Sequence, residues 1–275
     1  MTPRGGALPA QRVEFALGLI GIGKPWGFAN PEVPGERQAL TLLERAFALG
    51  VRYFDTAPSY GISEERLGRF LAGLTPGERS AVRIATKFGE HWDAAQAAPF
   101  VDHSLDALKR SLDGSVARLG RIDILQLHKT TPEVLRSSAL GRAWEYAAAL
   151  GITAIGASVS DLESAGLAIG DATYGMLQFP YNAAQRTFAG VLDRASARGM
   201  KIAVNRPFGM GRMLYEHREL SKAGAFGFIL EKRFEGVILS GTKSPDHLEE
   251  NWRAFGEALA RHEDDFTTET QRAQR

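Results

Sequence analysis

Residues 36–55 read ERQALTLLERAFALGVRYFD, and this stretch sets the pattern of the whole chain. Apolar residues recur at helical spacing over 36–49, which predicts an amphipathic helix. Gly50 follows at the position where helices commonly end on a glycine. Residues 51–54 then form a short β-rich run that ends at Asp55. The stretch is predicted to be a helix, a tight turn and a strand with a carboxylate at its carboxyl end.

The same alternation of short apolar runs and longer amphipathic runs continues along the chain. Strands are predicted at 15–22, 51–54, 82–86, 122–127, 152–157, 174–179, 201–204 and 237–239. Helices are predicted at 36–49, 63–72, 101–119, 132–150, 161–169, 188–198, 223–230 and 245–259. Such alternation implies parallel strands joined by helical crossovers. Eight units in 275 residues fit a single-domain α/β fold, a closed (β/α)8 TIM barrel, with an open doubly wound sheet as the alternative.

The bulk composition excludes several classes of protein. The chain contains 33 Lys and Arg against 32 Asp and Glu, a formal charge of +1. This balance gives no general attraction to nucleic acid or to an anionic membrane, so neither is expected as a partner. Cysteine is absent, which excludes disulfides, thiolate nucleophiles and cysteine zinc sites. The six histidines include no pair at helical metal-binding spacing, and no metal is expected.

The ends of the chain are polar. Residues 1–14 lack the apolar core of a secretory signal, and no apolar run approaches the roughly 18 residues of a membrane span. A cytoplasmic protein is therefore expected. Residues 1–14 are predicted to be an N-terminal extension, 15–260 the barrel and 261–275 a polar, frayed tail, while the oligomeric state is not predicted.

Polar residues end three consecutive predicted strands. They are Asp55, Lys87 and His128, and Tyr60 lies on the loop after Asp55. Alone, each has an ordinary interpretation, as a turn cap, a packing tyrosine, a surface lysine or a structural histidine. Together they lie at the carboxyl ends of the strands, where barrel enzymes carry their chemistry, and they predict an acid centre. The ammonium of Lys87 lowers the pKa of the Tyr60 phenol, and the carboxylate of Asp55 holds that ammonium in place. The imidazole of His128 contacts the substrate oxygen or relays a proton. Such a centre suits carbonyl reduction.

Several segments also resemble a known family. GVRYFDTAPSYG (50–61) with SEERLG (63–68), IATK (84–87) and IDILQLH (122–128) are similar to segments of the aldo-keto reductase superfamily, and the likeness runs from about 15 to 255. The resemblance implies an oxidoreductase that reduces a small-molecule aldehyde or ketone with NADPH, or alternatively NADH. It implies a catalytic set of Asp55, Tyr60, Lys87 and His128, with Tyr60 as the general acid.

The resemblance also implies cofactor-binding positions. Ser158 and Gln178 match the residues that hold the nicotinamide carboxamide, but Val159 stands where the family has Asn, and Asn205 stands where most members have a stacking aromatic. Further cofactor positions lie in three places. The first is the end of the first strand, with Gly21 and Gly23, and the second is Arg206, directly after Asn205. The third is the last strand and the start of the last helix, with Ser240, Gly241, Thr242, Lys243, Ser244, His247 and Asn251. His247 replaces a family arginine, so preference for NADPH over NADH is expected to be modest.

Some interpretations stay open from the sequence. Residues 240–251 also read as a plain helix start with Ser244 as N-cap, and the Gly21–Gly23 pair as a tight turn. Four aromatic residues past strand ends are candidates for a substrate pocket: Trp26, Phe28, Phe88 and Trp92. The departures at Val159 and Asn205 favour a second hypothesis, a cofactor-binding sensor with little turnover. A Schiff-base lyase using Lys87 is a third, opposed by the pairing of Lys87 with Asp55.

Overall fold

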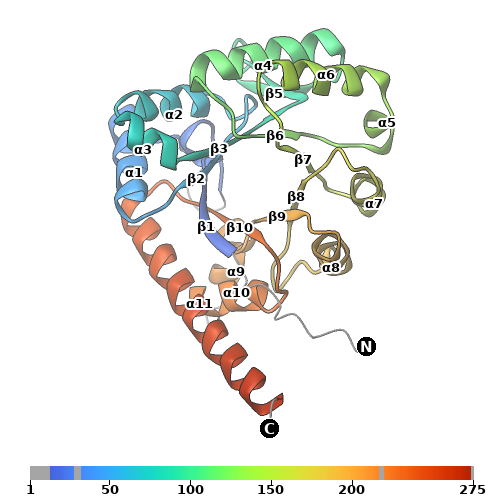
Figure 1. The fold of residues 1–275 in the computed structure, drawn as a ribbon. Coiled ribbons are helices and arrows are strands. Elements are labelled where there is room, and N and C mark those ends of the chain that lie inside the picture. The colour runs from blue at the N-terminus through green and yellow to red at the C-terminus, as the bar shows by residue number, and fades with distance from the viewer. Residues whose placement is uncertain (1–12, 28–31, 217–219, 274–275) are drawn as a thin grey trace.

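Eight parallel strands close into a barrel in the order β1-β10-β9-β8-β7-β6-β3-β2 (Figure 1). The computed structural model describes residues 13–27, 32–216 and 220–273, with side chains of the last helix described as far as His262. The barrel strands are β1 (Val13–Gly18), β2 (Tyr53–Asp55), β3 (Arg83–Phe88), β6 (Ile124–Leu127), β7 (Ile155–Ser158), β8 (Met176–Pro180), β9 (Lys201–Asn205) and β10 (Gly236–Gly241). The predicted (β/α)8 barrel is confirmed, and the open sheet is wrong.

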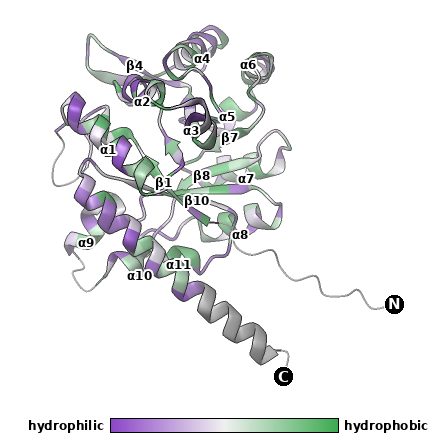
Figure 2. Cartoon of the chain, turned by 60° about the vertical axis from the view of Figure 1, so that its left-hand side comes forward, coloured by the Kyte–Doolittle hydropathy of each residue, from purple (hydrophilic) through white to green (hydrophobic). Residues whose placement is uncertain are grey.

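Helices surround the barrel on the outside (Figure 1). Those described are α1 (Glu36–Ala48), α2 (Ser63–Ala72), α3 (Pro76–Ala81), α4 (Leu105–Leu119), α5 (Pro132–Leu135), α6 (Ser138–Ala149), α7 (Leu162–Gly170), α8 (Ala189–Ala197), α9 (Arg212–Glu216), α10 (Lys222–Leu230) and α11 (Pro245–Ala273), with short 3-10 turns η1 (Ile20–Ile22) and η2 (Gly209–Gly211). Figure 2 shows the strands β8 and β10 as hydrophobic, while α1 and α11 carry both hydrophilic and hydrophobic residues. This is the pattern of helices that bury one face against a sheet.

Local capping explains where several helices differ from prediction. The predicted helix 132–150 is two helices, because the Ser137 hydroxyl accepts a hydrogen bond from the Ala139 amide and starts α6 anew. The helix predicted from 101 begins only after Ser104, which caps α4. Helix α3 was not predicted, although Thr75 and Glu78 form a capping box there. The last helix continues to Ala273, where a frayed tail was predicted from residue 261.

A two-stranded antiparallel hairpin inserts between β3 and α4 and was also not predicted. It consists of β4 (Glu90–Asp93) and β5 (Ala98–Val101). Its strands are four residues each and outside the barrel, so they lack the long apolar runs that mark the barrel strands. The hairpin brings Glu90 to the carboxyl end of the barrel, next to the predicted acid centre.

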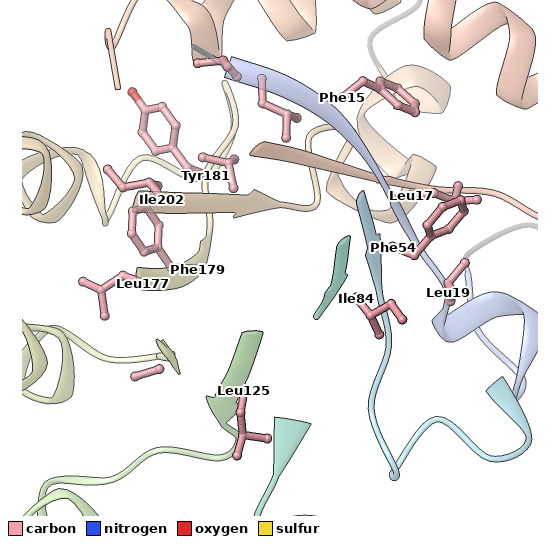
Figure 3. Close-up of a cluster of buried hydrophobic side chains, with 14 of the residues drawn as sticks. Phe15, Leu17, Leu19, Phe54, Ile84, Leu125, Leu177, Phe179, Tyr181 and Ile202 are labelled. Carbon is pink, nitrogen blue, oxygen red and sulfur yellow. The ribbon is translucent and has the colours of Figure 1, made fainter. Parts of the chain in front are cut away.

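Side chains on the barrel strands alternate between an outer and an inner layer. Phe15 and Leu17 of β1 pack in the large core between strands and helices, while Ala16 packs inside the barrel. Figure 3 shows part of the outer layer, including Leu17, Phe54 and Ile84 on neighbouring strands. The inner layer is a separate small cluster: Ala16, Tyr53, Ala85, Met176, Ala203, Val237 and Leu239. Above it, the barrel interior is lined by polar side chains.

Candidate active site

The alternation of strand side chains delivers the polar residues to one place. Two residues beyond the inward-facing Tyr53 comes Asp55, and two beyond Ala85 comes Lys87. Lys87 Nζ lies 2.6 Å from Asp55 Oδ1 and 2.9 Å from the Thr56 carbonyl oxygen. The two side chains are 1% and 4% exposed, so this is a buried ion pair. Lys87 lies within β3 rather than after it, because that strand extends to Phe88.

Tyr60 lies directly above the Lys87–Asp55 pair. Its ring centroid is 4.9 Å from Lys87 Nζ and 6.0 Å from the His128 ring centroid. The loop that carries Tyr60 packs tightly on the turn after β1. A Cβ atom at Gly23 would overlap the backbone oxygen of Tyr60, and Gly61 has φ of 61°. Only glycine fits at these two positions, so Gly23 positions the phenol rather than lining the cofactor region.

Burial and charge act in opposite directions on the Tyr60 phenol. Burial raises its pKa, Lys87 lowers it, and the pKa is above its usual value overall. The predicted effect of the ammonium is present, since Lys87 lowers the pKa of Tyr60, but desolvation by burial outweighs it. Tyr60 is protonated at neutral pH, the state that a proton donor requires.

Lys87 keeps its charge despite being buried. Burial lowers its pKa, but Asp55 and Tyr60 more than compensate, and the pKa of Lys87 is raised overall. A protonated amine is not a nucleophile, so the expected ion pair opposes Schiff-base chemistry at this position. Gln126 Nε2 donates to Asp55 Oδ2 at 3.4 Å, which adds a second donor to the buried carboxylate.

His128 contacts a residue that sequence reasoning missed. Its Nδ1 lies 3.1 Å from Glu90 Oε2, and the other oxygen, Oε1, lies 3.2 Å from Lys129 Nζ. Burial, followed by Lys87 and Lys129, holds the pKa of His128 well below its usual value. The ring is therefore neutral at pH 7, with Nδ1–H donating to the carboxylate and Nε2 left as an acceptor. No sequence motif marked Glu90, since the hairpin that carries it was predicted as part of a loop.

A cleft of about 1500 Å³ opens over the carboxyl ends of the strands. Asp55, Tyr60 and His128 line it, and Lys87 lies beneath them. It is also lined by most of the predicted cofactor residues: Gly21, Ser158, Gln178, Asn205, Arg206, Gly241, Thr242, Lys243, Ser244, His247 and Asn251. One continuous cleft thus joins the acid centre to the start of α11.

Two predicted cofactor positions face elsewhere. Gly23 packs under Tyr60, as described above. Ser240 is buried behind the cleft, where its Oγ accepts a hydrogen bond from Asn251 Nδ2 at 3.1 Å. Because strand side chains alternate, Ser240 points to the helix side of β10 while Leu239 faces the barrel. Its hydroxyl orients Asn251 and does not itself line the cleft.

Three buried acceptor oxygens on the cleft-lining residues have no hydrogen-bond partner within the described part of the chain. They are Gln178 Oε1, Asn205 Oδ1 and Asn251 Oδ1. Buried acceptors are rarely left unpaired. Amide and amine N–H groups, such as those of a nicotinamide carboxamide and an adenine, would satisfy them. These unpaired acceptors therefore fit a nicotinamide adenine dinucleotide.

The start of α11 has the geometry expected from its sequence. The His247 amide donates to Ser244 Oγ at 3.3 Å, so Ser244 is the predicted N-cap, and Pro245 opens the helix. A Cβ at Gly21 would lie 3.3 Å from Lys243 Cγ, so the glycine gives that side chain room to cross the cleft. Arg37 of α1 and Lys222 of α10 line the same region. Neither was predicted, because a single charge on a helix face carries no distinguishing signal.

The predicted aromatic pocket is only partly correct. Trp26 lines the cleft. Phe88 does not, because it is the last residue of β3 and packs in the outer core against Trp144, with ring centroids 4.7 Å apart. Trp92 is on β4 beside the cleft rather than lining it. Phe28 lies outside the described residues.

The fold and the site together define a (β/α)8 barrel protein with a buried ion pair and a tyrosine at the carboxyl end of its strands. A model of the Aldo/keto reductase family matches residues 14–227, more than half of the chain. The protein therefore belongs to the Aldo/keto reductase family.

Individual relatives match shorter segments. L-galactose dehydrogenase of Arabidopsis thaliana is 36% identical over 97 residues, which cover 34% of this chain and 28% of that protein. Versiconal hemiacetal acetate reductase of Aspergillus parasiticus is 34% identical over 139 residues, covering 44% and 39%. The chain thus matches less than half the length of these relatives, and their substrates do not carry over.

Solved structures share the whole fold. PA4992 of Pseudomonas aeruginosa, provisionally assigned as an aldo-keto reductase, superimposes with a TM-score of 0.75 at 27% identity, covering 89% of this chain and 90% of that one. The holo form of aldo-keto reductase AKR11C1 from Bacillus halodurans gives 0.74 at 18% identity, covering 90% and 91%, and supports the fold alone.

Two absences were expected from the sequence. Over residues 13–27, 32–216 and 220–273, no helix is long and apolar enough to cross a membrane. Among the described side chains, those of residues 13–27, 32–216 and 220–262, no three His, Asp or Glu residues gather as a metal site would require. The absence of a metal stays a prediction.

Proposed function

We propose that the protein is an NADPH-dependent reductase that converts an aldehyde or ketone to an alcohol, with NADH as the alternative cofactor. The observation that carries this proposal is the buried Lys87–Asp55 pair directly beneath Tyr60, at one end of a cleft whose other end offers unpaired acceptors. A protonated phenol over a fixed ammonium donates a proton well, because the ammonium stabilises the phenolate that remains.

The bound cofactor would supply a hydride to the carbonyl carbon. Tyr60 gives its proton to the carbonyl oxygen as negative charge develops there. Lys87 stabilises the resulting phenolate, and Asp55 holds Lys87 in place. His128 accepts a hydrogen bond at Nε2 in its neutral form, so it orients a hydroxyl group, either that of Tyr60 or that of the alcohol product.

The remaining cleft residues would bind and orient the dinucleotide. Ser158 and Gln178 are assigned to the carboxamide, and Asn205 lies beside them on the next strand. Thr242, Lys243 and Ser244 precede α11, where the helix N-terminus favours an anion, and they are assigned to the 2′-phosphate. Asn251 is assigned to the adenine, with Ser240 orienting its amide.

The variant Tyr60→Phe tests the role of the phenol. NADPH consumption with an aldehyde is expected to fall by at least about 10²-fold, the low end of what a general acid contributes. Because the ring and its packing remain, NADPH binding followed by fluorescence titration is expected to persist. Wild-type turnover in this variant would overturn the assignment of Tyr60.

A second candidate is a cofactor-binding sensor with little turnover. Val159 and Asn205 favour it, since both depart from the family pattern at the nicotinamide end of the cleft. NADPH binding without turnover of any aldehyde or ketone in a broad panel would support the sensor. Turnover that depends on Tyr60 would exclude it.

A further inference from the structure

Lys24 lies beside the general acid in an unusual setting. It follows η1, lines the cleft and is partly buried. Its Nζ is 5.6 Å from the ring centroid of Tyr60 and 5.7 Å from that of Trp92. No ion pair joins it to any residue that the structure describes. Two aromatic rings therefore flank its ammonium, and the side chain lines the cleft.

The surroundings of Lys24 leave positive charge in excess. Burial lowers the pKa of Lys24, Glu90 raises it and Lys129 lowers it further. The nearby carboxylates are already engaged, since Asp55 holds Lys87 and Glu90 contacts both His128 and Lys129. A partly desolvated ammonium without a carboxylate partner is costly unless an anion completes it.

Two further cations line the same cleft. Lys129 and Arg206 line it, and both have left-handed backbone, with φ of 52° and 56°. This conformation is strained for residues other than glycine, and such strain clusters at functional sites. The Arg206 guanidinium lies 6.0 Å from the ring centroid of Trp26. Lys24 is the least exposed of these three cleft-lining cations, since Lys129 and Arg206 are exposed and Lys24 is partly buried.

The position of Lys24 separates it from the groups assigned to the cofactor. Those groups come mainly from β7 to β10 and the start of α11, whereas Lys24 contacts Tyr60 after β2 and Trp92 on β4. Its ammonium therefore lies next to the general acid, apart from most of the groups assigned to the dinucleotide.

We propose that Lys24 binds an acidic group of the substrate, and that the protein acts on carbonyl compounds carrying a carboxylate or a phosphate close to the aldehyde or ketone. This inference rests on the proposed reductase function. The aromatic ring of Trp26, which lines the cleft, suits an aryl or otherwise flat body between the two groups. Lys129 and Arg206 widen the positive region, so that the acidic group enters it from solvent.

Matched substrates test the proposal by turnover. Benzaldehydes with an ortho, meta or para carboxylate are compared with their methyl esters, and 4-formylphenyl phosphate with 4-methoxybenzaldehyde. For at least one acid, kcat/KM is expected to exceed that of its neutral partner by tenfold or more. The series with the larger acid-to-neutral ratio of kcat/KM shows whether the site prefers a carboxylate or a phosphate. In Lys24→Met this ratio is expected to fall at least fivefold, and in Lys24→Arg to be largely retained.

A matched control guards against a general charge effect. Lys109 of α4 also lies over a tyrosine ring, 4.8 Å from the centroid of Tyr146, and does not line the cleft. In Lys109→Met the acid-to-ester ratio is expected to equal that of the wild type. An acid-to-neutral ratio of kcat/KM near one in the wild type, or a high ratio that survives in Lys24→Met, would overturn the proposal. Either outcome would leave the proposed reductase function standing, because both are measured from turnover.

Binding provides a readout that does not require turnover. The corresponding alcohol, 4-(hydroxymethyl)benzoate, is titrated by calorimetry against its carboxamide, in the presence of NADPH, with which an alcohol cannot exchange a hydride. The acid is expected to bind at least fivefold more tightly, with an affinity that falls as salt rises, and to lose this advantage in Lys24→Met. Equal binding of acid and amide would refute the role of Lys24 whether or not the protein turns over aldehydes.

Discussion

The two sides of the cleft are built differently. On the side of β2, β3 and β6, charged groups contact one another: Lys87 with Asp55, and Glu90 with His128 and Lys129. On the side of β8, β9 and α11, buried amide oxygens of Gln178, Asn205 and Asn251 have no partner in the described residues. We call these the proton-transfer side and the dinucleotide side.

The difference follows from what each side must do. A proton donor requires fixed charges before substrate arrives, since preorganised electrostatics stabilise the transition state. A binding surface instead presents acceptors that the ligand satisfies. Removing a group from the proton-transfer side should therefore lower stability strongly and turnover with it, whereas removing one from the dinucleotide side should mainly weaken cofactor binding.

The largest effect is expected for Lys87→Met. The substitution leaves the Asp55 carboxylate buried without its counter-charge, which costs about 3–5 kcal/mol of unfolding free energy. Aldehyde turnover is expected to fall by at least about 10²-fold, because Tyr60 loses the ammonium that stabilises its phenolate. Urea unfolding and steady-state kinetics measure the two effects.

The double variant Asp55→Asn/Lys87→Met is the control for this prediction. Removing both charges leaves no unpaired ion, so the double variant is expected to be more stable than Lys87→Met while remaining equally inactive. If the double variant instead loses as much unfolding free energy as Asp55→Asn and Lys87→Met lose together, the two residues do not act as a pair.

Most of the fold and of the proton-transfer side follows from sequence patterns. Strand periodicity and the spacing of Asp55, Lys87 and His128 suffice, because parallel strands bring their carboxyl ends to one rim. The net pKa of Tyr60 did not follow, since it depends on how far burial outweighs Lys87, and burial is a property of the packed barrel.

The misses share a physical origin. Phe88 was predicted to lie past a strand end, but β3 continues for two residues beyond the predicted strand, and alternation then turns its ring into the core. Glu90 was missed because its short hairpin has no strong apolar period. Ser240 lay in the right motif, yet which side of β10 it faces depends on strand register.

The pH dependence of stability tests the neutral state of His128. In the unfolded chain this histidine has a pKa near ~6.5, and in the folded protein burial and the nearby lysines hold it well below that. Below pH ~6.5 the unfolded state therefore binds more protons, and unfolding free energy falls by up to ~1.4 kcal/mol per pH unit from this group. In His128→Gln that contribution is absent, so the variant is expected to lose less stability between pH 7 and 5. Urea unfolding at each pH measures the unfolding free energy of both proteins. If that free energy falls equally in the wild type and in His128→Gln between pH 7 and 5, the pKa of His128 is not lowered.

The smallest expected effect concerns the dinucleotide side. Asn251→Ala removes an unpaired acceptor that lines the cleft, and NADPH affinity is expected to weaken about five- to tenfold, the value of one hydrogen bond of ~1 kcal/mol or slightly more. Ser240→Ala removes the hydroxyl that accepts a hydrogen bond of 3.1 Å from the Asn251 amide behind the cleft. In that variant NADPH affinity is expected to weaken by less than threefold, because the amide of Asn251 is still present but less firmly oriented. Fluorescence titration measures both affinities. Each variant leaves one buried partner of this hydrogen bond unpaired, so unfolding free energy is expected to fall by about 1–3 kcal/mol, less than in Lys87→Met, where a buried charge is left unpaired. A larger loss of affinity in Ser240→Ala than in Asn251→Ala would place the serine in the cofactor site and undo the distinction between a residue that binds and one that orients.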